Sequence, residues 1–299
     1  GAYTGSYAFT ANLPEGFTLA ADAPALTVTV ELGGAAMLVE GAAHSHPICG
    51  ANCLHTDGVQ HNESVTWTAW DGKSNITCNN GVAYLYLSDN VKSTNSYWNI
   101  SGADTIYLCL NGKTVTFGGY GANVNGDAIK LSGTSSLILC DCVGDGKIQL
   151  GTKGIDSQLS GIYVGEGCSL MMYGGTISGF NKSGVHVGGT NATNGVFYMY
   201  GGNITKNAAS DTGSGGVRVD SAANFDMYGG CISGNKGGFF GGGVYNGGIF
   251  RMHGGEIKDN TVTGTYDSSI LAGGGGVYND SIGVFEMSGG CISGNTVTK

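Results

Sequence analysis

Residues 225–235 read FDMYGGCISGN, and four other stretches of the chain repeat this pattern. All five carry Leu or Phe at the first place, Met at the third, Gly-Gly at the fifth and sixth, and Ile at the eighth. The other four are LMMYGGTIS from Leu170, FYMYGGNIT from Phe197, FRMHGGEIK from Phe250 and FEMSGGCIS from Phe285. The alternation predicts a strand with its first and third side chains inward. The glycine pair predicts a turn, because Gly accepts positive φ without steric cost.

The spacing of the repeats predicts the architecture. Their glycine pairs are separated by 27, 28, 25 and 35 residues, starting at Gly174, Gly201, Gly229, Gly254 and Gly289. This spacing suits one coil of a three-sided parallel β-helix, whereas a propeller blade needs about 40–45 residues and four strands. We therefore predict an all-β, right-handed parallel β-helix of about seven coils with three short strands per coil, plus a small N-terminal β segment.

Two further series support stacked coils. A second short strand precedes each repeat, and its inward residues are Ile162, Val185, Val217, Val244 and Val277. An asparagine follows the Ile of four repeats by three residues, at Asn207, Asn235, Asn260 and Asn295. In stacked coils these asparagines are expected to form a ladder of side-chain amides at one corner, whereas the first repeat has Phe180 at that place.

The chain divides into three parts by composition. Residues 1–40 read as two strands around a Pro-Glu-Gly turn and predict a partial immunoglobulin-like or β-hairpin segment. Residues 41–75 form a His/Cys-rich linker, and residues 76–299 form the predicted β-helix. Because solenoids need polar caps and the last coil stops without one, we expect a monomeric fragment of a longer chain.

The linker holds four of the chain's six histidines within HSHPICGANCLHTDGVQH, from His44 to His61. Zinc takes thiolate and imidazole ligands in tetrahedral sets. His46, Cys49, Cys53 and His55 are therefore candidate ligands of a structural zinc, with His44 or His61 as a substitute for one of them. No other cofactor is expected. The alternative is a Cys49–Cys53 disulfide beside exposed histidines.

The other cysteines lie inside the predicted coils. Cys109 and Cys140 are 31 residues apart, about one coil, so they are expected to be neighbours as a thiol pair or a disulfide. Cys231 and Cys291 share a repeat place with Glu256, which predicts exposure rather than special chemistry.

Composition excludes some classes of partner. The formal net charge is −9, and Arg218 and Arg251 are the only arginines. Nucleic acid is therefore not an expected partner, since phosphate binding needs clustered Lys and Arg. No run of about 18 apolar residues occurs, so no membrane-spanning segment is predicted.

Outward places of the repeats supply the candidate binding residues. One column, the Tyr163 column, consists of Tyr163, His186, Arg218, Tyr245 and Tyr278. The other, the Tyr173 column, consists of Tyr173, Tyr200, Tyr228 and His253. Aromatic columns can contact sugar rings or a protein partner, but stacked tyrosines also stabilise successive rungs without binding anything. No catalytic residue is assigned, because Asp220, Asp226 and Asp141 read as turn residues rather than acid–base pairs.

The repeat GGVY followed by FxMYGGxISGN resembles the Gly-rich β-helix repeats of large surface proteins from Gram-positive gut anaerobes. It is also similar to polymorphic outer-membrane protein repeats. TWTAWDG from Thr66, YLCLNGKTV from Tyr107 and LILCDC from Leu137 look like the entry coils of the same proteins. The resemblance implies an extracellular, cell-surface adhesin, with no defined ligand and no catalytic residues.

We therefore expect a secreted or cell-wall-attached surface protein that serves as a binding or presentation scaffold for a glycan or a host surface protein. We do not expect an enzyme. A carbohydrate-active enzyme, a polysaccharide lyase or glycoside hydrolase on a β-helix, is the first alternative. A passive structural stalk is the second.

Overall fold

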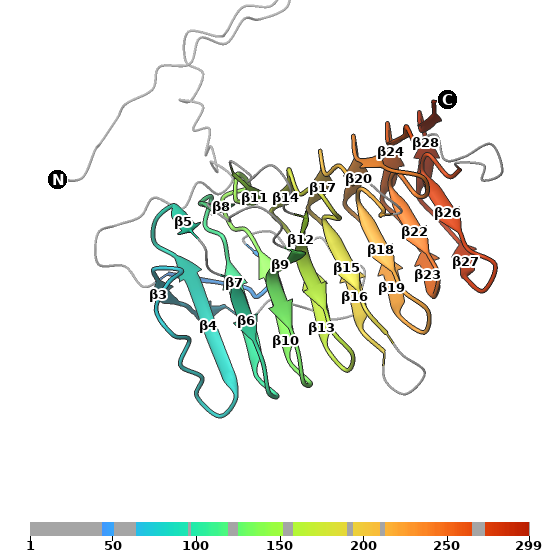
Figure 1. Cartoon of the computed structure of the whole chain (residues 1–299). Helices are drawn as coiled ribbons and strands as arrows, with labels where there is room; N and C mark the ends of the chain where they lie inside the picture. Colours follow the sequence, from blue (N-terminus) through green and yellow to red (C-terminus); the bar gives the residue numbers. More distant parts are fainter. Residues whose placement is uncertain are drawn as a thin grey trace, which may run out of the picture. The chain divides into compact units, whose positions relative to one another are not determined.

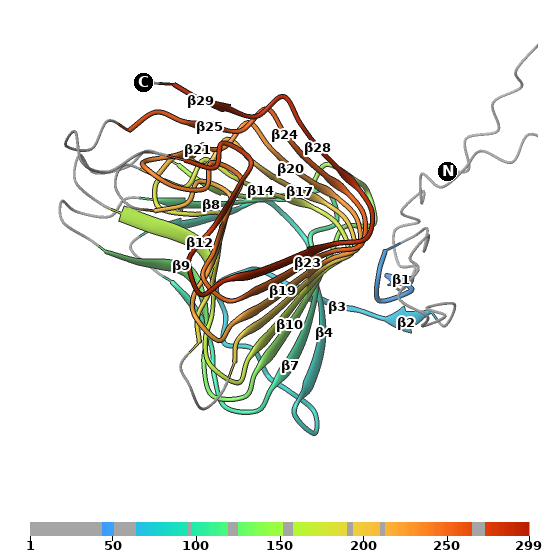
Figure 2. The ribbon, with the colours of Figure 1, turned by 90° about the vertical axis from the view of Figure 1, so that its right-hand side faces the viewer.

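A computed structural model describes residues 44–50, 64–94, 97–118, 125–151, 158–189, 194–209, 213–264 and 273–298. Residues 36–299 form one compact unit, and residues 1–35 form a second unit that lies outside the described residues. The larger unit is a parallel β-helix, as the repeats predict, built from three long sheets (Figure 1). Viewed from its C-terminal end, the chain turns counterclockwise as it advances toward the viewer, so the solenoid is right-handed (Figure 2).

The strands recur in the same order in every coil, and we name the three sheets by that order. Sheet 1 contains β3 (Thr68–Trp70), β4 (Val82–Leu87), β7 (Thr105–Cys109), β10 (Ser136–Cys140), β13 (Ser169–Met172), β16 (Val196–Met199), β19 (Asn224–Met227), β23 (Ile249–Met252) and β27 (Val284–Met287). Sheet 2 contains β5 (Val91–Thr94), β8 (Thr114–Gly118), β11 (Lys147–Leu150), β14 (Thr176–Ser178), β17 (Asn203–Thr205), β20 (Cys231–Ser233), β24 (Glu256–Lys258) and β28 (Cys291–Ser293). Sheet 3 contains β6 (Trp98–Ile100), β9 (Asn125–Leu131), β12 (Gln158–Val164), β15 (Val185–Val187), β18 (Val217–Val219), β22 (Val244–Asn246) and β26 (Val277–Asn279).

Two small sheets complete the described part. Three short parallel strands extend the later coils beyond sheet 2: β21 (Lys236–Gly237), β25 (Thr261–Val262) and β29 (Thr296–Val297). Near the N-terminal end, β1 (Ser45–His46) pairs antiparallel with β2 (Val65–Thr66). No described segment is a helix with the length and apolar character needed to cross a membrane.

The core consists of like residues stacked on like residues. Phe197, Phe225, Phe250 and Phe285 occupy one place of sheet 1, with successive ring centroids 4.7–4.9 Å apart. The isoleucines of the repeats stack in sheet 2, and the predicted valines stack in sheet 3. Stacking in register is necessary because a single coil cannot bury its own apolar side chains.

The two glycines of each pair are required for different reasons. At Gly229, an added Cβ would lie 2.4 Å from the carbonyl oxygen of Tyr200 on the previous rung, too close for any side chain. At Gly230 the backbone has a φ of 82°, a conformation that residues other than glycine rarely adopt. The pair therefore lets adjacent rungs approach and lets the chain turn from sheet 1 to sheet 2.

The predicted asparagine ladder is present and buried. Asn235 Oδ1 accepts from the backbone N–H of Asn207 at 3.0 Å and from its Nδ2 at 3.0 Å. Asn235 Nδ2 donates to Ile204 O at 2.9 Å and to Asn260 Oδ1 at 3.0 Å. Each side chain thus bonds an N–H and a carbonyl of the preceding rung's corner, which a bare turn would leave buried without partners.

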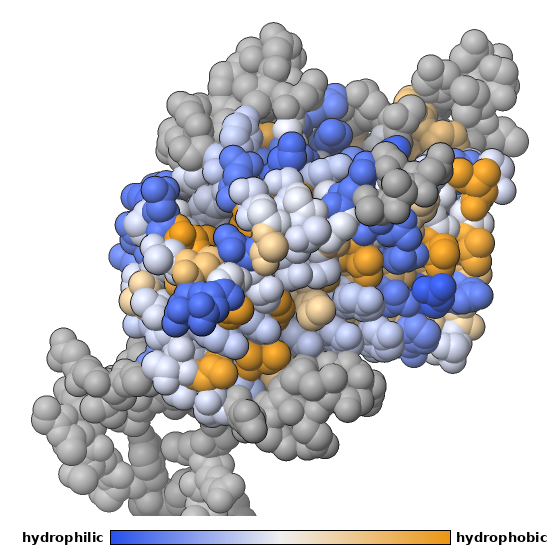
Figure 3. Space-filling view, turned by 90° about the horizontal axis from the view of Figure 1, so that it is seen from below, coloured by the Kyte–Doolittle hydropathy of each residue, from blue (hydrophilic) through white to orange (hydrophobic). Residues whose placement is uncertain are grey.

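The last described rung leaves residues of core places exposed, with Met287 47% and Ile292 36% accessible. Elsewhere, hydrophilic and hydrophobic residues alternate over the face seen from below, and hydrophobic ones reach the surface at the C-terminal edge (Figure 3).

Candidate metal centre and outward columns

The outer face of sheet 1 carries a second apolar cluster at its N-terminal end. Its buried members come from the β1–β2 region, from β7 and β10, and from the start of the Tyr173 column: Cys49, Trp67, Cys109, Ile138, Cys140 and Tyr173. Tyr84 and Tyr107 add to it, with ring centroids 4.5 Å apart. We call this the outer cluster.

Four metal-ligating side chains meet at the edge of the outer cluster. His44, His46, Cys109 and Cys142 each offer one ligand atom, and the four atoms lie within 4.8 Å of one another. His46 and Cys109 are buried, whereas His44 and Cys142 are partly buried. The group joins the β1 segment to the end of β7 and to the turn after β10.

The measured separations resemble the edges of a zinc tetrahedron. The two Nε2 atoms of His44 and His46 are 3.0 Å apart, the Sγ atoms of Cys109 and Cys142 are 3.5 Å apart, and Cys142 Sγ lies 3.8 Å from His44 Nε2. Zn–N bonds of about 2.0–2.1 Å and Zn–S bonds of about 2.3 Å give tetrahedral edges of about 3.3–3.8 Å. These three edges therefore need shifts of only a few tenths of an ångström to coordinate zinc.

Contacts with neighbouring residues orient the imidazoles of His44 and His46. His46 Nδ1 lies 2.6 Å from Pro47 O, so this nitrogen carries the proton and leaves the Nε2 lone pair toward the group. The His46 ring stacks on Trp67 at 4.5 Å, and Trp67 Nε1 donates to His46 O at 3.1 Å. His44 stacks on Tyr86 at 4.1 Å.

The thiols of the group are protonated when no metal is bound. The hydrogen bond between Cys109 and Cys140 raises the pKa of Cys109, and burial raises it further. The hydrogen bond with Cys109 and burial together raise the pKa of Cys142 to about 11. Metal binding would release these protons, as thiolate coordination does in general.

The group only partly coincides with the zinc set predicted from the sequence. His46 belongs to both, and His44, named as a substitute, takes part. Cys49 lies in the outer cluster but is not one of the four. Cys53, His55 and His61 lie outside the described residues, so the predicted set remains a prediction.

Cys109 and Cys142 were not predicted as ligands. Cys109 pairs with Cys140 in the register of sheet 1, which confirms that these two cysteines are neighbours, and neither is disulfide bonded. The signal was available in LILCDC, whose second cysteine falls on the turn beyond the strand, two residues after Cys140. What the sequence did not indicate was that the histidine segment lies against this turn.

The Tyr173 column is formed, and its rings stack on each other. Centroids are 4.8 Å apart for Tyr173–Tyr200, 5.0 Å for Tyr200–Tyr228 and 4.7 Å for Tyr228–His253, with interplanar angles of 10–16°. Each interior ring thus has both faces against its neighbours. Tyr86, Cys109 and Cys140 continue the same outward row toward the N-terminal end.

The Tyr163 column is also formed, on the outer face of sheet 3. Successive pairs are in direct register from Tyr163 through His186, Arg218 and Tyr245 to Tyr278. Arg218 lies over the Tyr245 ring, with Cζ 4.9 Å from the centroid, and the Tyr245 and Tyr278 rings stack at 5.7 Å. All five side chains are partly accessible.

Asp220, at the end of β18, ties the centre of this column together. Its Oδ2 lies 2.8 Å from His186 Nε2, and its Oδ1 accepts from Arg218 Nε at 2.8 Å. Burial raises the pKa of Asp220, but the hydrogen bond and charge of His186 and the charge of Arg218 outweigh it, and the net pKa is lowered. Asp220 is therefore a carboxylate at neutral pH.

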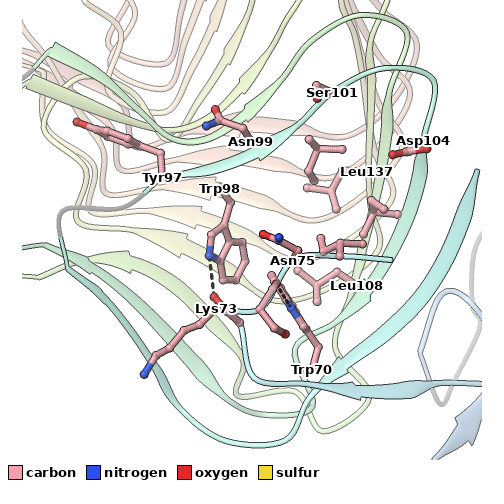
Figure 4. Close-up of a pocket in the computed structure, with 15 residues that line it drawn as sticks. Trp70, Lys73, Asn75, Tyr97, Trp98, Asn99, Ser101, Asp104, Leu108 and Leu137 are labelled. Atoms are coloured by element: carbon pink, nitrogen blue, oxygen red, sulfur yellow. Dashed lines mark hydrogen bonds between the residues drawn. The ribbon is translucent and has the colours of Figure 1, made fainter. Parts of the chain in front are cut away.

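A hollow of about 350 Å³ opens at the N-terminal mouth of the solenoid (Figure 4). The indoles of Trp70 and Trp98 lie beside it, and both N–H groups donate to the adjoining loop, to Ser74 O at 2.9 Å and Gly72 O at 3.0 Å. Core residues Leu108 and Leu137 form its floor. Trp70 and Trp98, with ring centroids 4.7 Å apart, thus line an incompletely filled end of the core.

Comparison of the chain with protein-family models, with curated proteins and with solved structures gave no match. The class that the fold defines is a parallel β-helix solenoid with a His/Cys group at its N-terminal end.

Proposed function

We propose that this chain is a scaffold of the extracellular cell surface, of the adhesin type, that presents the outer face of sheet 3 to a glycan or a host surface protein. The observation that carries the proposal is the Tyr163 column, in which five consecutive rungs place aromatic or cationic side chains outward in register. A continuous hydrogen-bonded ladder beneath it supplies a rigid base, and a binding site on a rigid element loses little entropy when a ligand binds.

Two ionised carboxylates near this column can accept hydrogen bonds from the hydroxyls of a ligand. Asp220 and Asp280 both have a lowered pKa, Asp280 because Tyr245 and the backbone N–H of Ser281 donate to it. A glycoside hydrolase needs one carboxyl with a raised pKa as its proton donor. This pair contains no such donor, but burial raises the pKa of Asp127, which interacts with His186 and Tyr163 of the same column.

A passive stalk is the second candidate, and the stacking of the Tyr173 column favours it. Rings that cover each other's faces stabilise successive rungs and leave mainly edges and hydroxyls to a ligand.

The experiment is a binding screen of the whole chain against a glycan array and immobilised epithelial surface proteins. Binding that falls at least tenfold on Tyr245→Ala, but not on Tyr200→Ala, supports the adhesin proposal. No binding in either format, from protein whose circular dichroism shows a folded β-structure, overturns it in favour of the stalk.

We further propose that the metal of the His44, His46, Cys109 and Cys142 group is zinc in a structural role. All four positions of a tetrahedron are filled by protein, which leaves none for a substrate. The ligands come from segments about one hundred residues apart in the chain, so the ion would fasten the β1–β2 region to the first coils.

Cobalt substitution tests this site, because Co²⁺ replaces zinc and reports thiolate ligands through its absorption spectrum. One equivalent should bind with a tetrahedral, thiolate-containing spectrum, which Cys142→Ser should abolish. Cys231→Ser is the matched control, since Cys231 lies on sheet 2 away from the group. Failure to bind cobalt or zinc, or a Cys109–Cys142 disulfide in protein purified under reducing conditions, would overturn the assignment.

A further inference from the structure

The corner between sheets 3 and 1 is shortened on one rung. The turn from β18 to β19 has four residues, 220–223, and the turn from β26 to β27 has four, 280–283. Between them, the turn from β22 to β23 has only two, 247–248, and both are glycine. Since the three rungs are stacked in register, the short turn leaves a notch between two longer ones.

The notch is a pocket of about 370 Å³. Gly247 forms its floor, and the lining is completed by Gly189, Arg218, Asp220, Ser221, Tyr245, Asp280 and Ile282. This volume lies at the lower end of the range of about 300–1,000 Å³ found for small-molecule sites. Arg218 and Tyr245 belong to the Tyr163 column, so the pocket is continuous with the proposed binding face.

The polar groups of the notch are already held in place by the protein. Arg218 Nε donates to Asp220, and among the described residues no acceptor is paired with the two terminal nitrogens of Arg218. The Tyr245 hydroxyl donates to Asp280 Oδ2 at 2.6 Å, and the Ser281 backbone N–H donates to Asp280 Oδ1 at 2.7 Å. The carboxylates of Asp220 and Asp280, as acceptors, and the guanidinium of Arg218, as a donor, therefore line the same pocket in fixed positions.

This set of charges restricts the ligand. Two carboxylates repel an anion, and the guanidinium between them disfavours a metal cation. The faces of the Tyr245 ring are covered by Arg218 and Tyr278, so the pocket offers hydrogen bonds rather than a flat stacking surface. A ligand with several hydroxyls can donate to Asp220 and Asp280 and accept from Arg218, and Ile282, which is 67% exposed, can contact its C–H surface.

We infer that the notch between residues 220–223 and 280–283 is a binding site for one unit of an uncharged saccharide. The inference rests on the proposed binding function and names its site and ligand class. A monosaccharide has about twelve non-hydrogen atoms, which at the ligand efficiency of drug-sized molecules corresponds to an affinity in the millimolar range. Tight binding would require several units along a glycan chain.

The experiment uses saturation-transfer NMR on the whole chain with methyl α-glucoside, methyl α-galactoside, methyl α-mannoside, glucosamine and sialic acid as probes. At least one uncharged methyl hexoside should bind, with glucosamine and sialic acid at least tenfold weaker. Arg218→Gln should reduce binding at least tenfold. Arg251→Gln, the only other arginine and on sheet 1, is the matched control and should leave binding unchanged.

A second variant tests the pocket without removing any charge. A Cβ at Gly247 would lie 3.3 Å from Val219 O and 3.4 Å from Tyr245 Cε1, so Gly247→Ala needs only small adjustments while it raises the floor. It should lose saccharide binding and keep the melting temperature of the parent protein. A glycan bound equally by parent and both variants would place the site elsewhere, leaving the proposed scaffold function intact, whereas preference for glucosamine or sialic acid would overturn the ligand class. No binding to any probe or to the glycan array would overturn both.

Discussion

The two ends of the solenoid are stabilised in different ways. From β16 onward each rung repeats the same Phe, Met and Ile, and the asparagine ladder fastens the corner. From β4 to β10 the repeat is degenerate, and the outer cluster covers the outside of sheet 1 as a second layer. Over the later coils the same outer face carries the single stacked row of the Tyr173 column beside ion pairs, with Arg251 between Asp226 and Glu286. Regular stacking therefore makes one layer sufficient, whereas irregular coils coincide with a second layer and a candidate metal centre.

The largest effect should follow from breaking the regular end at its centre. Phe225→Ala removes a fully buried ring that stacks on Phe197 at 4.8 Å and on Phe250 at 4.7 Å. We expect a loss of about 3–5 kcal/mol in the free energy of unfolding, from lost burial and the cavity left behind. Urea denaturation followed by circular dichroism measures it.

Phe285→Ala is the matched control, because Phe285 occupies the same repeat place on the last described rung and is only partly buried. Its loss should be less than half as large. Equal losses at the two positions would show that stacking between rungs is not the source of the stability.

The next effect should come from the asparagine ladder. Asn235→Ala leaves the buried backbone N–H of Asn207 and the carbonyl of Ile204 without their side-chain partner. Unsatisfied buried groups cost about 1–3 kcal/mol each, so we expect a loss of about 2–4 kcal/mol in unfolding free energy. Asn295→Ala, at the accessible end of the ladder, should lose about 1 kcal/mol or less. A loss at Asn235 no larger than at Asn295 would contradict a cooperative ladder.

This contrast also explains what the sequence could predict. The regular end could be derived in detail, since five aligned repeats indicate which residues face inward, where the chain turns and which asparagines meet. The N-terminal end could not, because Cys109 and Cys142 meet His44 only through packing between segments that share no repeat. The notch was likewise hidden: GG at 247–248 reads as another flexible turn until it is placed between two longer turns on neighbouring rungs. Stacked positions are periodic in sequence, and contacts between layers are not.

Zinc should act on the irregular end alone. At a free concentration one hundred times its dissociation constant, a ligand that binds only the folded state stabilises it by about 2.7 kcal/mol. Hydrogen–deuterium exchange should therefore slow on adding zinc for peptides covering β2, β3 and β7, and should be unchanged for β19 and β23. Cys142→Ser should remove the protection. Equal protection at both ends would indicate that the ion stabilises the whole solenoid and does not fasten one end.

The smallest effect should come from Asp220, whose contribution to stability depends on pH. Its pKa is lowered in the folded state below the ordinary value of 3.8, so its ionisation contributes stability above that pH. The contribution is lost as the pH falls below 3.8 through the lower folded-state value, because both states then become protonated.

Asp220→Asn should therefore cost about 1 kcal/mol or less at pH 7, since the carboxylate is partly accessible, and the difference from the parent should disappear in strong acid. Urea denaturation of both proteins at several pH values between 7 and 2 measures this. Asn235→Ala, which removes no titratable group, is the control, and its difference from the parent should not converge in acid. A constant difference between parent and Asp220→Asn at every pH would mean that hydrogen-bond geometry, and not charge, holds His186 and Arg218 in the column.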